Sequence, residues 1–120
     1  ERVGEAIAEA IPGVGARQGT CAVLEVGAGH GTFTESVLDA GAQVTVTEMS
    51  QPSAEYLQRE FASNPSVTIV YDNNGEEAFR LQYRYDIVLY ISVLHHIQDY
   101  LVQLRRVSEE LVRTGGTIVA

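Results

Sequence analysis

One segment near the start of the chain, residues 23–34 (VLEVGAGHGTFT), restricts the fold more than any other. It begins as an apolar run that contains Glu25, continues with glycines at positions 27, 29 and 31, and then takes on a helical pattern. Alternate glycines let a backbone turn sharply and approach a ligand closely, and a helix that begins there offers unpaired N–H groups. The segment therefore predicts a buried strand, a loop that binds a nucleotide cofactor, and a helix.

The glycine spacing distinguishes between classes of nucleotide cofactor. The dinucleotide fingerprint is G-x-G-x-x-G, whereas this loop is G-x-G-x-G and has Thr32 at the sixth position. A loop that binds a pyrophosphate does not need an acid two residues before its first glycine, where this chain has Glu25. A ligand with an ammonium group would use one, so the loop favours such a ligand.

Strand and helix patterns alternate along the chain. Apolar and β-branched runs predict strands, and apolar residues at a helical period predict helices, the one after position 50 capped by Ser50. The predicted strands are residues 22–26, 44–48, 67–71, 87–91 and 117–119, and the predicted helices are residues 1–11, 32–40, 51–62 and 100–113. This alternation predicts an α/β fold, a doubly wound parallel sheet of about five strands with helices on both faces.

Acidic residues mark the ends of three predicted strands. Glu25 precedes the glycine loop, Glu48 ends the second strand, and Asp72 follows the third. The carboxyl ends of parallel strands form a crevice in which ligands bind. Glu48 stands 21 residues after Gly27. At this distance a carboxylate can accept hydrogen bonds from both hydroxyls of a ribose. A solvated acid at a strand end is the alternative for Glu48.

Two segments resemble motifs of the class I S-adenosylmethionine (SAM)-dependent methyltransferases. Residues 25–31 (EVGAGHG) meet every fixed position of the family's first motif, E/D-x-G-x-G-x-G. Residues 85–97 (YDIVLYISVLHHI) are similar to its fourth-strand segment, F-D-x-V followed by small residues and L-x-H. The resemblance covers residues 22–120 and implies a Rossmann-like sheet of seven strands. We therefore expect residues 1–120 to form a SAM-binding methyltransferase domain that is incomplete at its C-terminus and lacks the last two strands.

The resemblance also implies roles for residues at the crevice. Glu25, the glycine loop and main-chain groups at Tyr90 and Ile91 would hold the methionyl amino group, and Glu48 would bind the ribose. Met49 would pack on the adenine, with core packing as its alternative. Asp72 and Asn73 would contact the adenine edge, with a turn at residues 72–75 as their alternative. The predicted cofactor-binding residues are Glu25, Gly27, Ala28, Gly29, Glu48, Met49, Asp72, Asn73, Tyr90 and Ile91.

Three further residues are assigned from their type and position. His95 and His96 are the candidate general bases, because histidine can take a proton near neutral pH. Adjacent side chains point in different directions, so at most one faces a substrate, and a packing role is the alternative. Asp86 begins its strand and is expected to have a structural role. The chain has no C-x-x-C or H-x-x-x-H pattern, and we expect no metal site.

Charge and composition restrict the partners. The net charge is −8 and the basic residues are eight scattered arginines, which disfavours a nucleic-acid partner. Cys21 is the single cysteine, no run approaches ~18 apolar residues, and the N-terminus carries acids where a signal peptide is basic. We therefore expect a cytoplasmic protein that has no contact with a membrane.

These features predict methyl transfer from SAM to an O, N or C nucleophile of a small molecule by direct displacement, with S-adenosylhomocysteine (SAH) as the product. One alternative is an NAD-dependent oxidoreductase, against which Glu25 and Thr32 count. The other is a non-catalytic domain that binds SAM or serves as a scaffold. The sequence leaves the acceptor and the oligomeric state open.

Overall fold

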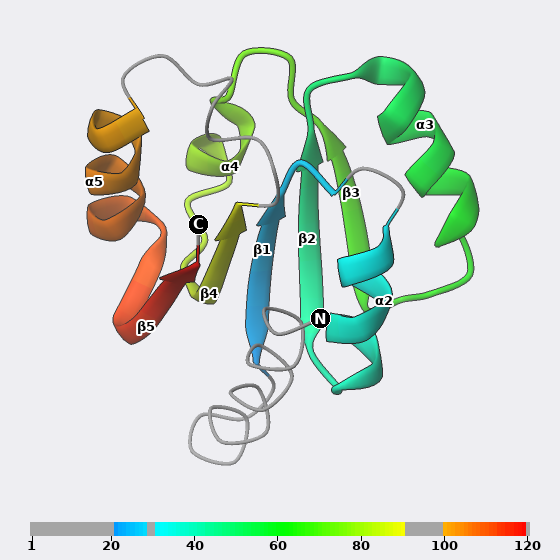
Figure 1. Cartoon of the computed structure of the whole chain (residues 1–120), viewed down its shortest axis with the longest axis horizontal. Coiled ribbons are helices and arrows are strands. Elements are labelled where there is room, and N and C mark those ends of the chain that lie inside the picture. Colours follow the sequence, from blue (N-terminus) through cyan, green and yellow to red (C-terminus); the bar gives the residue numbers. More distant parts are fainter. Residues whose placement is uncertain (1–20, 29–30, 91–99, 120) are drawn as a thin grey trace.

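Within the residues that the computed structural model describes, 21–28, 31–90 and 100–119, the chain forms a five-stranded parallel sheet (Figure 1). In spatial order its strands are β3 (Val67–Tyr71), β2 (Gln43–Glu48), β1 (Ala22–Val26), β4 (Tyr85–Tyr90) and β5 (Val112–Val119). Each neighbouring pair is parallel. The chain runs outward from β1 to β3 and then returns to β4 on the other side of β1. The predicted doubly wound topology is therefore confirmed, with its switch point between β1 and β4.

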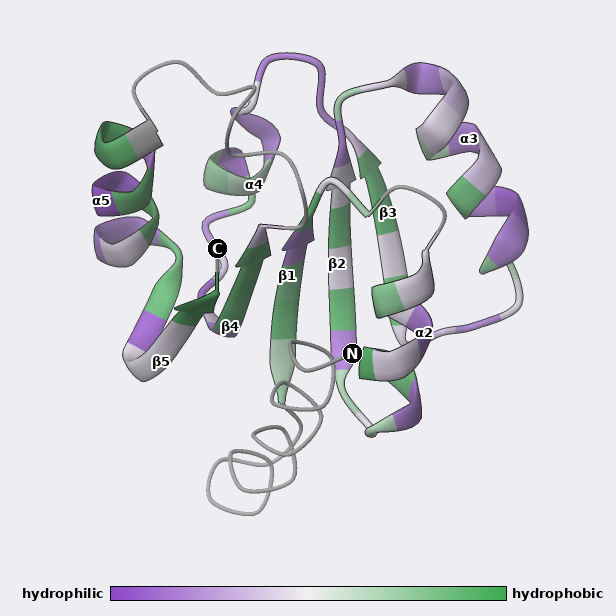
Figure 2. Ribbon diagram, in the orientation of Figure 1, coloured by the Kyte–Doolittle hydropathy of each residue, from purple (hydrophilic) through white to green (hydrophobic). Residues whose placement is uncertain are grey.

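Helices cover both faces of this sheet. The helices α2 (Thr32–Asp39) and α3 (Gln51–Glu60) lie on one face, and α4 (Glu77–Arg80) and α5 (Tyr100–Glu110) lie on the other. Because side chains alternate along a strand, Val23 of β1 packs in one core with Leu57 of α3, whereas Leu24 packs in the other with Val107 of α5. Both cores follow the apolar strands of Figure 2. No helix in this described part has the length and apolar character needed to cross a membrane.

The last strand begins earlier than the sequence predicts. The predicted strand starts at Thr117, but β5 starts at Val112, and α5 ends at Glu110. Tyr85 pairs with Val112 and Ile87 pairs with Thr117, so the ladder continues across an irregularity in register. Gly116 allows this close approach, since a Cβ there would lie 2.7 Å from the main-chain oxygen of Asp86. The helix predicted over residues 1–11 lies outside the described residues.

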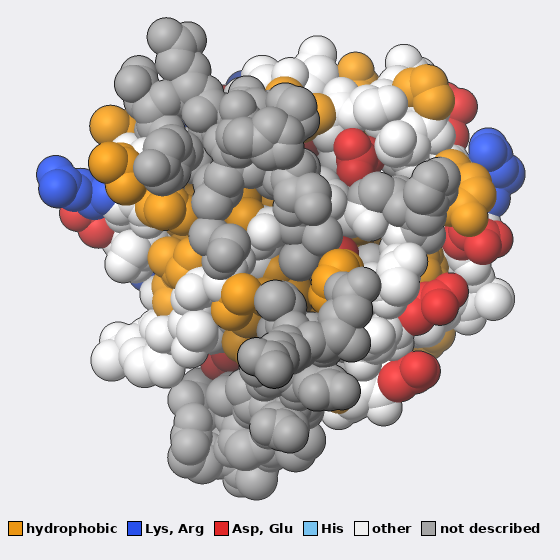
Figure 3. All heavy atoms as spheres, viewed as in Figure 1, with side chains coloured by type: hydrophobic (Ala, Val, Ile, Leu, Met, Phe, Trp, Pro, Cys, Tyr) orange, Lys and Arg blue, Asp and Glu red, His pale blue; other side chains and the backbone are white. Residues whose placement is uncertain are grey.

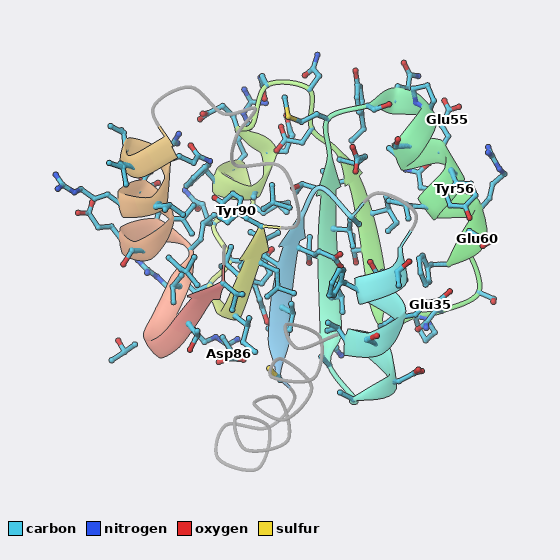
Figure 4. The ribbon with its side chains drawn as sticks, viewed as in Figure 1. Glu35, Glu55, Tyr56, Glu60, Asp86 and Tyr90 are labelled. Atoms are coloured by element: carbon cyan, nitrogen blue, oxygen red, sulfur yellow. The ribbon has the colours of Figure 1, made fainter. Side chains whose placement is uncertain are left out.

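Asp86 joins three strands at the end of the sheet opposite to Tyr90 (Figure 4). Its buried carboxylate accepts a hydrogen bond of 2.8 Å from the Ala22 N–H of β1. The guanidinium of Arg113, on β5, donates to the same carboxylate at 3.2 Å. These contacts confirm the structural role predicted for Asp86. The cap predicted for α3 is confirmed too, because Ser50 Oγ accepts from the Ser53 N–H.

Candidate functional site

The carboxyl ends of β1 to β4 meet at the upper edge of the sheet in Figure 1. Glu25 is the next-to-last residue of β1 and pairs in register with Val46 of β2 and Leu89 of β4. Both neighbours are fully buried, so the Glu25 carboxyl enters an apolar environment at the centre of the sheet. The sequence therefore places an ionisable group where burial strongly affects its charge.

The Glu25 carboxyl is fully buried and only partly hydrogen-bonded. Its Oε1 accepts a hydrogen bond of 2.7 Å from the Thr34 hydroxyl on α2. Its Oε2 has no hydrogen-bond partner within residues 21–28, 31–90 and 100–119. Burial raises the pKa of this carboxyl from 4.5 to about 7; the Thr34 hydrogen bond acts in the opposite direction, and the negative charge of Glu48 raises the pKa further. A buried acceptor without a donor is costly, so this oxygen is a candidate ligand contact.

The described part of the glycine loop packs on the ends of β1 and β2. The Gly27 N–H donates to the Thr47 oxygen at 2.9 Å, and the Gly31 N–H donates to the Ala28 oxygen at 3.0 Å. Gly31 is the residue directly before α2, and no side chain caps the helix there. The loop therefore brings Ala28 and the start of α2 close to Glu25.

Glu48 and Asp72 lie together at the ends of β2 and β3. The Asp72 N–H donates to the Glu48 main-chain oxygen at 2.9 Å. Glu48 is half-buried, and its Oε1 accepts from the Ser50 N–H at 3.4 Å. Asp72 is buried, and its Oδ1 accepts from the N–H groups of Gly75 and Glu76 at 2.8 and 3.1 Å. The turn interpretation of Asp72 is therefore confirmed for Oδ1, while its contact with adenine stays a prediction.

A cavity of about 340 Å³ opens beside these strand ends, on the face of the sheet covered by α4 and α5. Four of the predicted residues line it, namely Met49, Asp72, Asn73 and Tyr90. Met49 is 53% exposed, so the core-packing alternative for this residue is wrong. The structure thus brings the predicted adenine contacts together, whereas Glu25 and Glu48 lie outside this cavity.

Tyr90, for which a main-chain role is predicted, places its side chain in this region. The ring is buried in the core beneath α5, and burial raises the pKa of the phenol while a hydrogen bond with Gln103 opposes that rise. Figure 4 shows the labelled residue between the sheet and the α4 and α5 helices. Gln103 also lines the cavity, so this polar pair lies in its wall.

An ion pair joins α5 to the residue before α4 in the outer wall of the cavity. The Arg106 guanidinium of α5 donates to Glu76 at 2.8 Å and lies 3.6 Å from the centroid of the Phe79 ring. Both Glu76 and Phe79 line the cavity. These contacts connect α4 to α5, so the wall is built from residues that are far apart in the sequence.

Three residues of this region were not predicted from the sequence: Thr34, Phe79 and Gln103. The signal for Thr34 was its position three residues after the last loop glycine, about one helical turn away. Gln103 and Phe79 had no such signal, because their place depends on how α4 and α5 pack. The predicted residues Gly29, Ile91, His95 and His96 lie outside the described part of the chain.

Comparison with known proteins identifies the family. The model of a family described as a methyltransferase domain matches residues 24–118. The chain belongs to this methyltransferase family. The resemblance in the first motif and the Rossmann-like class I fold are therefore confirmed, and the family assignment favours a methyltransferase over an NAD-dependent oxidoreductase.

Three relatives of this methyltransferase domain illustrate the similarity. The chain is 31% identical over 97 residues to the ubiquinone biosynthesis O-methyltransferase of Proteus mirabilis, covering 80% of this chain and 39% of that protein. The CcbJ methyltransferase of Streptomyces caelestis is 30% identical with a TM-score of 0.68, covering 94% of this chain and 50% of that one. A coclaurine N-methyltransferase bound to N-methylheliamine and SAH is 25% identical with a TM-score of 0.69, covering 96% and 35%. The chain thus spans half or less of each relative.

Proposed function

We propose that this domain binds SAM and that the enzyme to which it belongs transfers a methyl group to an O, N or C nucleophile of a small molecule. The observation that carries the proposal is the fully buried Glu25 carboxyl, whose Oε2 has no hydrogen donor among the described residues. The ammonium group of an amino acid would supply that donor and a compensating charge. A dinucleotide has no such group to offer.

The residues at the strand ends fit the other parts of SAM. Glu48 is half-buried beside the glycine loop and would accept hydrogen bonds from the ribose hydroxyls. Met49, Asp72 and Asn73 line a cavity of about 340 Å³ and would hold the adenine. This volume lies in the range of small-ligand sites, roughly 300–1,000 Å³. Main-chain groups at Gly27, Ala28, Gly29, Tyr90 and Ile91 would complete the site.

The role proposed for the protein is to bind and to orient. SAM, when bound, supplies a methyl group on a positively charged sulfur, and that carbon is already activated toward a nucleophile. The chain's residues would fix the donor, align the acceptor and exclude water. His96 or His95 would accept the proton of an acceptor that must lose one, and the general-base role stays a proposal for both.

The names of two of these relatives and the surface charge support a small-molecule acceptor. One relative acts in ubiquinone biosynthesis, and another is bound to N-methylheliamine. Acidic side chains are exposed over α2 and α3, where red groups gather in Figure 3, and they include Glu35, Glu55 and Glu60. Such a surface disfavours nucleic acid. A cytoplasmic location, supported by the single cysteine, belongs to the same proposal.

Glu48→Ala is expected to weaken SAH binding about 30-fold at pH 8, because two hydrogen bonds to a half-buried acceptor are lost, at about 1 kcal/mol each. Calorimetric titration of the variant and the wild type measures this. Glu60→Ala is the matched control, since it removes an exposed acid at the far end of α3 and should leave the affinity unchanged. Equal affinities for Glu48→Ala and the wild type would contradict the ribose role.

A further inference from the structure

The buried hydroxyl of Thr34 contacts the Glu25 carboxyl. Thr34 is the third residue of α2, and its side chain is fully buried. Its hydroxyl donates to Glu25 Oε1 at 2.7 Å, the usual distance for a hydrogen bond of this kind. Thr34 does not line the cavity beside the strand ends. The hydroxyl therefore acts on Glu25 rather than on a ligand in that cavity.

This hydrogen bond leaves the two carboxyl oxygens in different states. An ionised carboxylate accepts hydrogen bonds through both oxygens. Thr34 satisfies Oε1, whereas Oε2 has no partner in the described ranges. The side chain is thus held by one oxygen, and the other is available to a donor from outside the described residues.

We propose that Thr34 is a positioning residue, which holds Glu25 Oε1 so that Oε2 receives the ammonium group of the amino-acid part of the ligand. The inference rests on the proposed function, because it takes SAM or SAH as that ligand. Thr34 needs no contact with the ligand in this arrangement. Its effect reaches the ligand through the orientation and charge of Glu25.

The charge of Glu25 makes the inference measurable. Burial and the negative charge of Glu48, at the end of β2, both favour the neutral form, and the Thr34 hydroxyl favours the ionised form. The other side chains that face Glu25 from the neighbouring strands, Val46 and Leu89, carry no charge. The pKa of the Glu25 carboxyl is about 7. Because an ammonium group needs the ionised form, SAH affinity should fall as the pH drops below about 7.

The experiment compares Thr34→Val with Thr34→Ser by calorimetric titration between pH 6 and pH 8.5. Valine keeps the shape of the side chain without its donor, and serine keeps the donor. Two probes are used: SAH, which carries the ammonium group, and 5′-methylthioadenosine, which has the adenosine and the sulfur without it. Ser36→Ala is the matched control, because it removes an exposed hydroxyl from the same helix.

In Thr34→Val we expect the midpoint of the SAH pH profile to move up by about one unit and the affinity at pH 7 to fall about fivefold. At pH 8.5 most of the affinity should return, a recovery that a damaged site would not show. Thr34→Ser and Ser36→Ala should follow the wild-type profile, and 5′-methylthioadenosine should bind all four proteins alike.

Two results would contradict different parts of the account. Identical pH profiles for SAH in the wild type and Thr34→Val, with both proteins binding it, would overturn the positioning role of Thr34. That result would not contradict the proposed SAM site. Failure of both probes to bind the wild type at any pH would overturn the proposed function itself.

Discussion

Glu25→Gln is expected to reduce SAH affinity at least about 100-fold at pH 8, because it removes the buried charge that would pair with the ammonium group. Glutamine keeps the size of the side chain and an acceptor for the Thr34 hydroxyl, so the fold should be retained. Calorimetric titration measures the loss. Glu55→Gln, on the exposed surface of α3, is the matched control and should bind SAH like the wild type. A Glu25→Gln variant with wild-type affinity would contradict the ammonium site.

The same variant should make the fold more stable at alkaline pH. The pKa of the Glu25 carboxyl is about 7 in the folded protein, compared with an ordinary value of 4.5. Unfolding therefore releases a proton between about pH 4.5 and pH 7, and the stability of the wild type falls by about 3 kcal/mol as the pH rises through this window. The glutamine side chain does not titrate in this range, so the variant lacks this loss of stability.

Urea unfolding at pH 5 and at pH 8 tests this linkage. The wild type should lose stability between the two values through Glu25, and Glu25→Gln should lose less by up to about 3 kcal/mol. A variant that depends on pH as strongly as the wild type would show that Glu25 is not held neutral by burial. Gain of stability together with loss of binding is the pattern expected of a functional residue that is costly to bury.

Gly31→Ala is expected to destabilise the fold by roughly 3 kcal/mol, from a strained backbone and a clash in the core. Gly31 has a φ of +88°, and an added Cβ would lie 2.9 Å from the Phe61 ring and 3.2 Å from a Leu57 methyl group. The start of α2 would have to move, and SAH binding should weaken with it.

Gly41→Ala distinguishes the effect of backbone strain from that of the clash in the core. Gly41 has a similar φ of +93°, but nothing lies within 4 Å of an added Cβ. Its substitution should cost about 1 kcal/mol, the backbone contribution alone. Urea unfolding of both variants gives the difference. Equal losses in Gly31→Ala and Gly41→Ala would show that Phe61 and Leu57 move aside without cost.

The parts of the fold that were predictable follow from local patterns. The apolar run before Gly27 and the glycines after it determine β1 and the loop, because a strand and a close turn need those residue types. Alternation of strands and helices then implies the parallel sheet. The start of β5 at Val112 was not predictable, because it depends on register with β4 and on the close approach of Gly116 to Asp86.

Some residues of the candidate site were also predictable from the sequence, and others were not. Glu25, Glu48 and Asp72 were predictable because strand ends of a parallel sheet lie at one edge. The use of Asp72 Oδ1 by its own turn was one of two open alternatives, and only the folded loop decides it. The Thr34 contact and the wall formed by Phe79 and Gln103 depend on the packing of helices against the sheet, which no local pattern specifies. The ligand roles of all these residues stay predictions.

Parallel calorimetric titration of the unmodified chain with SAH and with NAD at pH 8 tests the central claim most directly. We expect saturable binding of SAH at one site and no binding of NAD, because only SAH brings an ammonium group to the buried Glu25 carboxyl. Binding of NAD without SAH, or binding of neither ligand, would contradict it.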